Sequence, residues 1–236
     1  MSEGVLALVG GAEWRDGCTF DRTLLSESGA QEVLVIPTAA AYEYPAKAVN
    51  WATQYFRELG VATKALDLLK RSDAFRTEIV DEIASATMIY LSGGSPFHLR
   101  SVIKQTPALD ALVSFYRSGG FLAASSAGAM VLTDPMADPR GGALTVGLGL
   151  VSNLAFVPHF DTFSSETERR TISLAKGEIV VAGVDEETAL IRRPGGLWSA
   201  EGKGAVSLFE DGAGIPLDNL DQRISVALHG ELRVSH

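Results

Sequence analysis

Short runs of aliphatic and β-branched residues alternate with amphipathic stretches along the first half of the chain. Five of these runs predict strands, over residues 5–9, 32–36, 62–66, 88–91 and 120–124. The stretches between them predict helices, over residues 44–59, 76–84, 96–105 and 108–118. Strands that alternate with helices indicate βαβ units and a mainly parallel sheet. Such sheets place their ligand sites where strands end, and here Gly, Thr or Ser follows several strand ends at once.

The second half of the chain is richer in strand-like runs with glycine-rich connections. Further strands are predicted over residues 148–150, 155–157, 179–184, 188–191, 197–199 and 205–208. A helix is predicted over 165–175, with Ser164 or Ser165 as its cap. Segment 134–142 has the Asp, Pro and Gly content of a loop. The chain has no internal repeat and no long linker, so we predict a single domain over residues 1–236.

Segment 119–130 carries the strongest chemical signal. A short apolar run ends at Ser126 among small residues, and an alanine-rich, helix-competent stretch follows at once. This pattern is typical of a strand that turns sharply into a helix with one hydroxyl at the apex. Ser126 is therefore a candidate nucleophile, and Ser125 is the competing hydroxyl. The non-catalytic alternative is a small buried residue that allows the strand and the helix to pack closely.

A nucleophilic serine needs a base and an orienting carboxylate. His159 follows the predicted strand 155–157, a position from which its ring can reach a hydroxyl; His98 is its rival, and a structural histidine is the alternative. The acidic turn 185–187 lies between two predicted strands and offers Glu186, with Asp185 as the fallback. A solvated turn without a catalytic role is the alternative for these carboxylates.

Two glycine pairs follow predicted strands. Gly93 and Gly94 come after the strand 88–91, where their N–H groups could stabilise an oxyanion. Gly10 and Gly11 come after the first strand, but no Gly-x-Gly-x-x-Gly pattern follows. The end of the second strand also lacks the acidic residue of a dinucleotide site. The sequence therefore does not favour a nucleotide cofactor.

Composition narrows the classes of partner. The 236 residues carry a net charge of −9, which argues against nucleic acid, and there is no basic run suited to a membrane surface. No apolar run approaches the roughly 18 residues that a membrane span requires. The first residues resemble a buried strand and lack the basic region of a signal peptide, so we expect a cytoplasmic protein. Cys18 is the only cysteine, which excludes an internal disulfide and a cysteine-based metal site.

Taken in order, six short segments resemble the S51 serine peptidase family, which includes peptidase E (aspartyl dipeptidase) and cyanophycinase. They are Gly10-Gly11-Ala12-Glu13, Ile36-Pro37-Thr38-Ala39, Leu91-Ser92-Gly93-Gly94, Ser126-Ala127-Gly128-Ala129, Pro158-His159-Phe160-Asp161 and Val184-Asp185-Glu186-Glu187-Thr188-Ala189. The resemblance spans about residues 5–210. It implies a class I glutamine amidotransferase-like three-layer α/β fold with a mainly parallel central sheet. It also implies a Ser-His-Glu triad without metal or cofactor, and a homodimer.

The resemblance assigns roles to residues of this chain. Ser126 would be the nucleophile, His159 the base and Glu186 the orienting carboxylate. The oxyanion donors would be the backbone of the Gly93-Gly94 turn and the N–H of Ala127. This order of serine, histidine and acid differs from the order of serine, acid and histidine in α/β-hydrolases.

The resemblance also implies a substrate class. Relatives similar to cyanophycinase carry spaced arginines after the histidine, whereas here Arg169 and Arg170 are adjacent; apart from the resemblance, Arg169, Arg170 or Arg140 could clamp an acidic side chain or a terminal carboxylate, with an exposed helix surface as the alternative. Pro158 before His159 favours a peptidase E-like specificity, because cyanophycinase-like members carry Asp-Gln before the histidine. We therefore expect a serine exopeptidase or dipeptidase for small peptides with an acidic residue on the N-terminal side. The alternatives are a cyanophycinase-like or other amidohydrolase, and an inactive member that binds a small molecule.

Overall fold

A seven-stranded sheet forms the centre of the computed structural model, which describes residues 3–162 and 165–226. Its strands lie in the order β13 (Leu197–Gly202), β12 (Thr188–Arg193), β1 (Val5–Val9), β5 (Phe121–Ser125), β4 (Met88–Leu91), β2 (Glu32–Ile36) and β3 (Ala62–Ala65). The five strands from β1 to β3 in this order are parallel, and β12 and β13 pair antiparallel at the other edge. The predicted mainly parallel α/β fold is confirmed.

Alternating side chains of the central strands enter two separate apolar layers. In β1, Leu6 and Leu8 belong to one layer, whereas Val5, Ala7 and Val9 belong to the other. Helices α3 (Thr77–Ser85), α4 (Pro96–Ile103), α5 (Pro107–Arg117) and α6 (Ala127–Leu132) supply the first layer. Helices α1 (Thr19–Ser28) and α2 (Pro45–Glu58) cover the opposite face. The sheet is therefore the middle layer of three, as the period of two along its strands requires.

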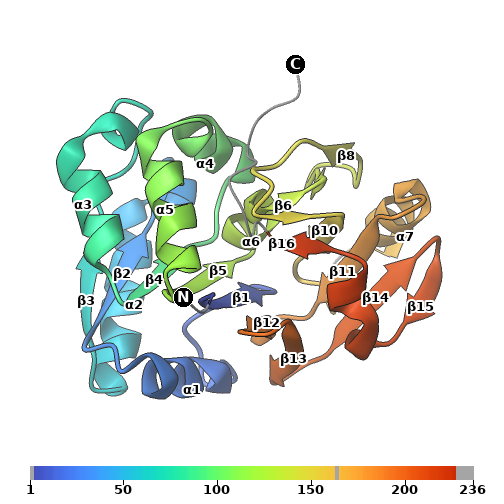
Figure 1. The fold of residues 1–236 in the computed structure, drawn as a ribbon, viewed down its shortest axis with the longest axis horizontal. Coiled ribbons are helices and arrows are strands. Elements are labelled where there is room, and N and C mark those ends of the chain that lie inside the picture. Colours follow the sequence, from blue (N-terminus) through green and yellow to red (C-terminus); the bar gives the residue numbers. More distant parts are fainter. Residues whose placement is uncertain (1–2, 163–164, 227–236) are drawn as a thin grey trace.

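A second sheet extends the molecule beyond β12 and β13 (Figure 1). Its strands lie in the order β10 (Leu154–Val157), β11 (Val180–Val184), β14 (Val206–Glu210) and β15 (Ala213–Ile215). Helix α7 (Ser165–Leu174) lies beside this sheet (Figure 1). Short strands complete the structure in two small sheets: β6 (Thr133–Asp134), β9 (Val151–Ser152) and β16 (Ser225–Val226), and β7 (Met136–Ala137) with β8 (Leu144–Thr145).

Most predicted elements occur within two residues of their expected bounds. Segment 134–142, predicted as a loop, contains Asp134 of β6 and the whole of β7, and the short strands β8, β15 and β16 were not predicted. The strand expected over 148–150 is absent, and β9 begins at Val151. Helix α1 was not predicted, because Asp21 lies on its buried face and interrupts the apolar stripe formed by Phe20, Leu24 and Leu25. The predicted cap Ser164 of α7 lies outside the described residues. The single domain stays a prediction.

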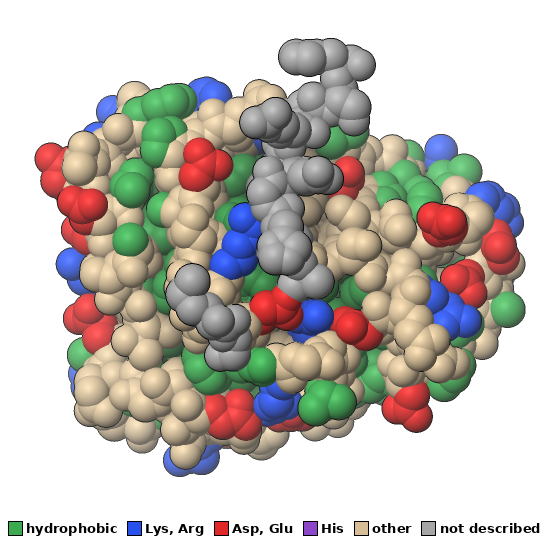
Figure 2. Space-filling view, in the orientation of Figure 1, with side chains coloured by type: hydrophobic (Ala, Val, Ile, Leu, Met, Phe, Trp, Pro, Cys, Tyr) green, Lys and Arg blue, Asp and Glu red, His purple; other side chains and the backbone are tan. Residues whose placement is uncertain are grey.

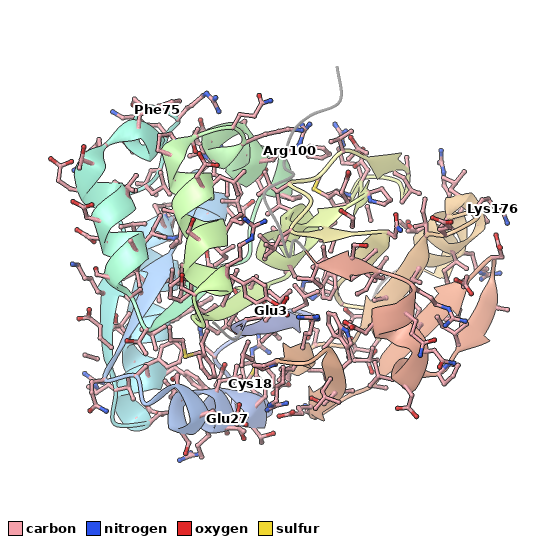
Figure 3. All side chains as sticks on the ribbon, viewed as in Figure 1. Glu3, Cys18, Glu27, Phe75, Arg100 and Lys176 are labelled. Carbon is pink, nitrogen blue, oxygen red and sulfur yellow. The ribbon has the colours of Figure 1, made fainter. Side chains whose placement is uncertain are left out.

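Charged side chains of both signs are interspersed over the face in Figure 2. Among the described residues, no helix is long and apolar enough to cross a membrane. The main buried charge is Arg192, which donates to Glu3, to Asp221 (2.9 Å) and to Tyr116 (3.1 Å). Glu3 lies beside β1 (Figure 3), so this network connects the start of the chain to β12.

Candidate active site

The turn between β5 and α6 holds Ser126 in a strained conformation. Its φ and ψ are 47° and −110°, values that residues other than glycine adopt rarely. The Ser126 N–H donates to Val9 O (2.9 Å), and the Ser126 carbonyl accepts from Met130 N (2.9 Å). A Cβ at Gly128 would lie 2.8 Å from Leu91 O. Only small side chains fit around this turn, which explains the Gly and Ala content of the sequence.

The imidazole of His159 meets this hydroxyl. Ser126 Oγ lies 3.0 Å from His159 Nε2. His159 follows β10 with a positive φ of 53°, and its N–H donates to Gly10 O (2.7 Å). Gly11 lies against the ring, because a Cβ at this position would approach His159 Cε1 to 2.2 Å. Gly10 and Gly11, directly after β1, therefore hold the backbone and the ring of His159 in place.

The turn between β11 and β12 supplies the third group. His159 Nδ1 lies 2.8 Å from Glu186 Oε1, and the Glu186 N–H donates to Asp161 Oδ1 (2.9 Å). Asp185, the fallback carboxylate, accepts from Ala205 N (2.8 Å) instead. A hydroxyl, an imidazole and a carboxylate therefore form one hydrogen-bonded chain. Along such a chain the imidazole can accept the hydroxyl proton while the carboxylate stabilises the resulting cation.

The two rival residues point elsewhere. Ser125 Oγ is buried and donates to Glu13 Oε2 (2.7 Å). His98 Nε2 lies 2.9 Å from Leu69 O, and its ring packs edge-on against Tyr42. Neither side chain takes part in the hydrogen bonds that connect Ser126, His159 and Glu186.

The candidate oxyanion donors lie in two turns, Gly93-Gly94 after β4 and Ala127 at the start of α6. The Gly93 N–H donates to Glu13 Oε1 (3.0 Å) and is therefore occupied. Within the described ranges, the N–H groups of Gly94 and Ala127 have no hydrogen-bond partner. Gly94 has a φ of 135°, and a Cβ there would lie 2.4 Å from Ala39 O, so only glycine fits.

Glu13 is the site residue that sequence reasoning missed. Its only signal is its position in the Gly10-Gly11-Ala12-Glu13 segment, which carries part of the family resemblance. Its carboxylate bonds to residues 80 and 112 positions away along the chain, so no local pattern reveals the contact.

Ser126 and His159 open into a pocket of about 590 Å³. The pocket lies between the loop after β1 and helix α2, and Trp14, Trp51 and Tyr55 contribute aromatic surface. Its charged lining residues are the acidic Glu13, Asp16, Glu43 and Glu58 and the basic Arg15 and Lys47. This size suits a small molecule or a short peptide.

The arginines expected to bind substrate do not line this pocket. Arg169 and Arg170 are exposed residues of α7. Arg140 pairs with Asp138 (2.7 Å) and lies over the ring of Phe97 at 4.6 Å. Segment 134–142 does not contribute to the pocket wall either. A role of these arginines in substrate binding stays a prediction.

Comparison with known proteins identifies the family of this chain. The sequence model of the family described as "Peptidase family S51" matches residues 6–197. The chain belongs to peptidase family S51. Among the described residues, no group of three or more His, Cys, Asp or Glu side chains could hold a metal ion.

Named relatives support this membership of family S51. The chain is 24% identical to a "Cyanophycinase" of Nostoc sp. over 95% of this chain and 83% of the relative. An "Uncharacterized peptidase PM1590" of Pasteurella multocida is 33% identical over 43% of this chain and 47% of that protein.

Solved structures share the fold. The structure "Crystal structure of a peptidase from an acI-B1 Actinobacterium" superposes with a TM-score of 0.80, at 31% identity over 91% of this chain and 93% of that one. A putative peptidase E of Listeria monocytogenes superposes with a TM-score of 0.67 over 86% of this chain and 100% of that one. At 19% identity, the second structure supports the fold alone.

Proposed function

We propose that this S51 peptidase is a serine exopeptidase that hydrolyses small peptides through Ser126, His159 and Glu186. The observation that carries the proposal is the hydrogen-bonded chain that begins at the strained turn. Ser126 Oγ lies 3.0 Å from His159 Nε2, and His159 Nδ1 lies 2.8 Å from Glu186 Oε1. These are hydrogen-bonding distances, and the third group orients the second, as nucleophilic catalysis requires.

The reaction follows from these positions. His159 accepts the Ser126 proton through Nε2 while Oγ attacks the peptide carbonyl carbon. Glu186 stabilises the resulting imidazolium through Nδ1–H. The N–H groups of Gly94 and Ala127 donate to the oxyanion, since neither has another partner among the described residues. The amine leaves with the proton from His159, and water then hydrolyses the acyl-enzyme by the same route.

An acidic residue on the N-terminal side of the scissile bond remains our proposed preference. Arg15 and Lys47 are the basic side chains of the pocket wall, and either would pair with a substrate carboxylate. A second candidate is cyanophycin hydrolysis, which is favoured by the similarity to relatives named cyanophycinase over 95% of this chain.

Hydrolysis of a small panel tests the proposal. The panel contains Asp-Leu, β-Asp-Leu, Glu-Leu, Ala-Leu and cyanophycin. Wild type should cleave at least one member, and Ser126→Ala should lower kcat by on the order of 10³-fold or more, because the nucleophile is lost. Ser125→Ala should lower kcat roughly tenfold, since it removes one hydrogen bond to a charged group.

The exposed Ser114 on α5 provides the matched control. Ser114→Ala should retain wild-type turnover. Unchanged turnover in Ser126→Ala would refute the assignment of the nucleophile. Cleavage of cyanophycin without cleavage of any dipeptide would favour the second candidate.

A further inference from the structure

The carboxylate of Glu13 lies in the pocket wall beside the nucleophile. Glu13, Gly93, Ser126 and His159 line the same pocket. A Cβ at Gly93 would lie 3.2 Å from Glu13 Oε1 and 3.5 Å from Ser126 Cβ. The carboxylate and the nucleophile therefore flank the same glycine, on the pocket side of the turn.

Two donors hold this carboxylate in place. Gly93 N–H donates to Oε1 at 3.0 Å, and the buried Ser125 hydroxyl donates to Oε2 at 2.7 Å. Each oxygen of Glu13 thus acts as an acceptor, as the ionised form does. A carboxylate has about four lone-pair sites, so each oxygen can accept one further hydrogen bond. Glu13 is partly exposed to the pocket, where a ligand can supply those donors.

The negative charge of Glu13 has no cationic partner in the described part of the chain. No Lys, Arg or His nitrogen there lies within 4.0 Å of its oxygens. The charge also acts on its surroundings: burial is the main reason why the pKa of Asp21 rises to about 8, and Glu13 adds to this rise. An uncompensated carboxylate beside Ser126 opposes the developing oxyanion unless a cation binds it.

A peptide substrate brings its own α-nitrogen close to the nucleophile. In the residue that provides the scissile carbonyl, the α-nitrogen is about 2.5 Å from the carbonyl carbon. If Ser126 attacks that carbon, the α-nitrogen therefore lies within a few ångströms of Ser126 Oγ. In an N-terminal residue this nitrogen is an ammonium with three donors; inside a peptide it is an uncharged amide with one.

We propose that Glu13 binds the free α-ammonium of the substrate and thereby restricts hydrolysis to the bond after an N-terminal residue. The proposal rests on the proposed function for the position of the scissile carbonyl. It makes Glu13 a specificity-determining residue, and Gly93 N–H the group that holds its carboxylate. The oxyanion is left to Gly94 and Ala127.

Calorimetric titration separates binding from turnover. Ser126→Ala and Ser126→Ala/Glu13→Gln are each titrated with Ala-Leu and with N-acetyl-Ala-Leu. Glutamine is the conservative variant, because its carbonyl oxygen still accepts from Gly93 N–H. Ser126→Ala should bind Ala-Leu about 10- to 100-fold more tightly than the acetylated peptide, as expected for a charge-assisted hydrogen bond. Glu13→Gln should abolish this difference by weakening only the binding of Ala-Leu.

A second glutamate controls for the change in net charge. Glu78→Gln, on the exposed face of α3, removes one charge far from the pocket and should preserve the preference for Ala-Leu. The affinity for Ala-Leu should also fall as the pH rises past about 8, where the peptide ammonium loses its proton. The affinity for the acetylated peptide should stay constant over that range.

Three results would overturn the proposal. Glu13→Gln could weaken the binding of both peptides equally, it could leave the preference for Ala-Leu over N-acetyl-Ala-Leu intact, or neither peptide could bind to Ser126→Ala. Equal weakening would show that Glu13 only shapes the turn. Failure of the proposed function is distinguishable, because it would appear as turnover that does not depend on Ser126, whatever the binding preference.

Discussion

At the residue scale, Asp21 is a buried acid whose raised pKa the neighbouring Tyr55 hydroxyl lowers only in part. It is fully buried on α1, and neither carboxyl oxygen has a hydrogen-bond partner among the described residues. Burial raises its pKa from 3.8 to about 8, so the native protein holds this proton at pH 7. The unfolded chain releases the proton above about pH 4.

This difference makes stability depend on pH. Between about pH 4 and pH 8 the native state binds more protons than the unfolded state, so the free energy of unfolding falls as the pH rises. Asp21→Asn removes the titrating group and should flatten this fall, with a gain at pH 8 of up to roughly 3 kcal/mol relative to pH 5.5. Urea unfolding of both proteins at pH 5.5 and 8 measures the effect. If the free energy of unfolding fell equally with pH in wild type and Asp21→Asn, Asp21 would not be the cause of the pH dependence.

The adjacent hydroxyls of Ser125 and Ser126 show what the sequence could predict at this scale. The small neighbours of the pair predicted the sharp turn and favoured Ser126 as the nucleophile. In the structure, the Ser125 hydroxyl bonds to Glu13, whereas the Ser126 hydroxyl bonds to His159. That difference depends on the positive φ of Ser126 and on a glutamate more than one hundred residues earlier, neither of which a local pattern contains.

At the element scale, the site forms where five turns meet. The ends of β1, β4 and β5 reach the same edge of the parallel sheet, and the segments after β10 and β11 bring His159 and Glu186 to it. Gly11, directly after β1, lies against the imidazole. Its missing side chain is therefore part of the catalytic geometry that we propose.

Gly11→Ala should displace the imidazole. The added methyl would meet His159 Cε1 at 2.2 Å, and the φ of 124° disfavours any side chain. We expect kcat to fall by about 10²-fold, the cost of misplacing a reacting group by about 1 Å. Gly29→Ala is the matched control: Gly29 also has a positive φ, of 66°, but a Cβ there contacts nothing within 4 Å. It should lower the melting temperature and leave kcat unchanged. An equal loss of kcat in both variants would show that backbone strain, and not the contact with His159, is responsible.

Elements with a regular apolar pattern were predictable, and the exceptions have physical causes. Strands β1 and β4, and β2 after its exposed first residue Glu32, are continuous apolar runs because both of their faces are covered by helices. Helix α1 was not predicted because Asp21 occupies a buried position of its apolar face. The raised pKa keeps this side chain uncharged, whereas residue type alone predicts a charged, exposed aspartate.

At the scale of the whole molecule, two helical layers hold a sheet whose edge carries the site. Both apolar layers include side chains of β1, β4 and β5, the strands that end at the site. This packing makes the strand ends a rigid base for Ser126 and the Gly93-Gly94 turn. The homodimer and the single domain stay predictions, which light scattering and the cooperativity of unfolding would test against a chain mass of 25.0 kDa.

Covalent trapping tests the central claim most directly. An organophosphorus fluoride reacts with a serine hydroxyl that is activated by a neighbouring base, and intact-mass spectrometry counts the adducts. Wild type should gain one adduct, which peptide mapping assigns to Ser126, and Ser126→Ala should gain none. Glu186→Gln should react about 10²–10⁴-fold more slowly, because the imidazole loses the carboxylate that fixes its tautomer. An adduct on another residue, the same labelling of Ser126→Ala, or no labelling of wild type would contradict a Ser126–His159–Glu186 peptidase.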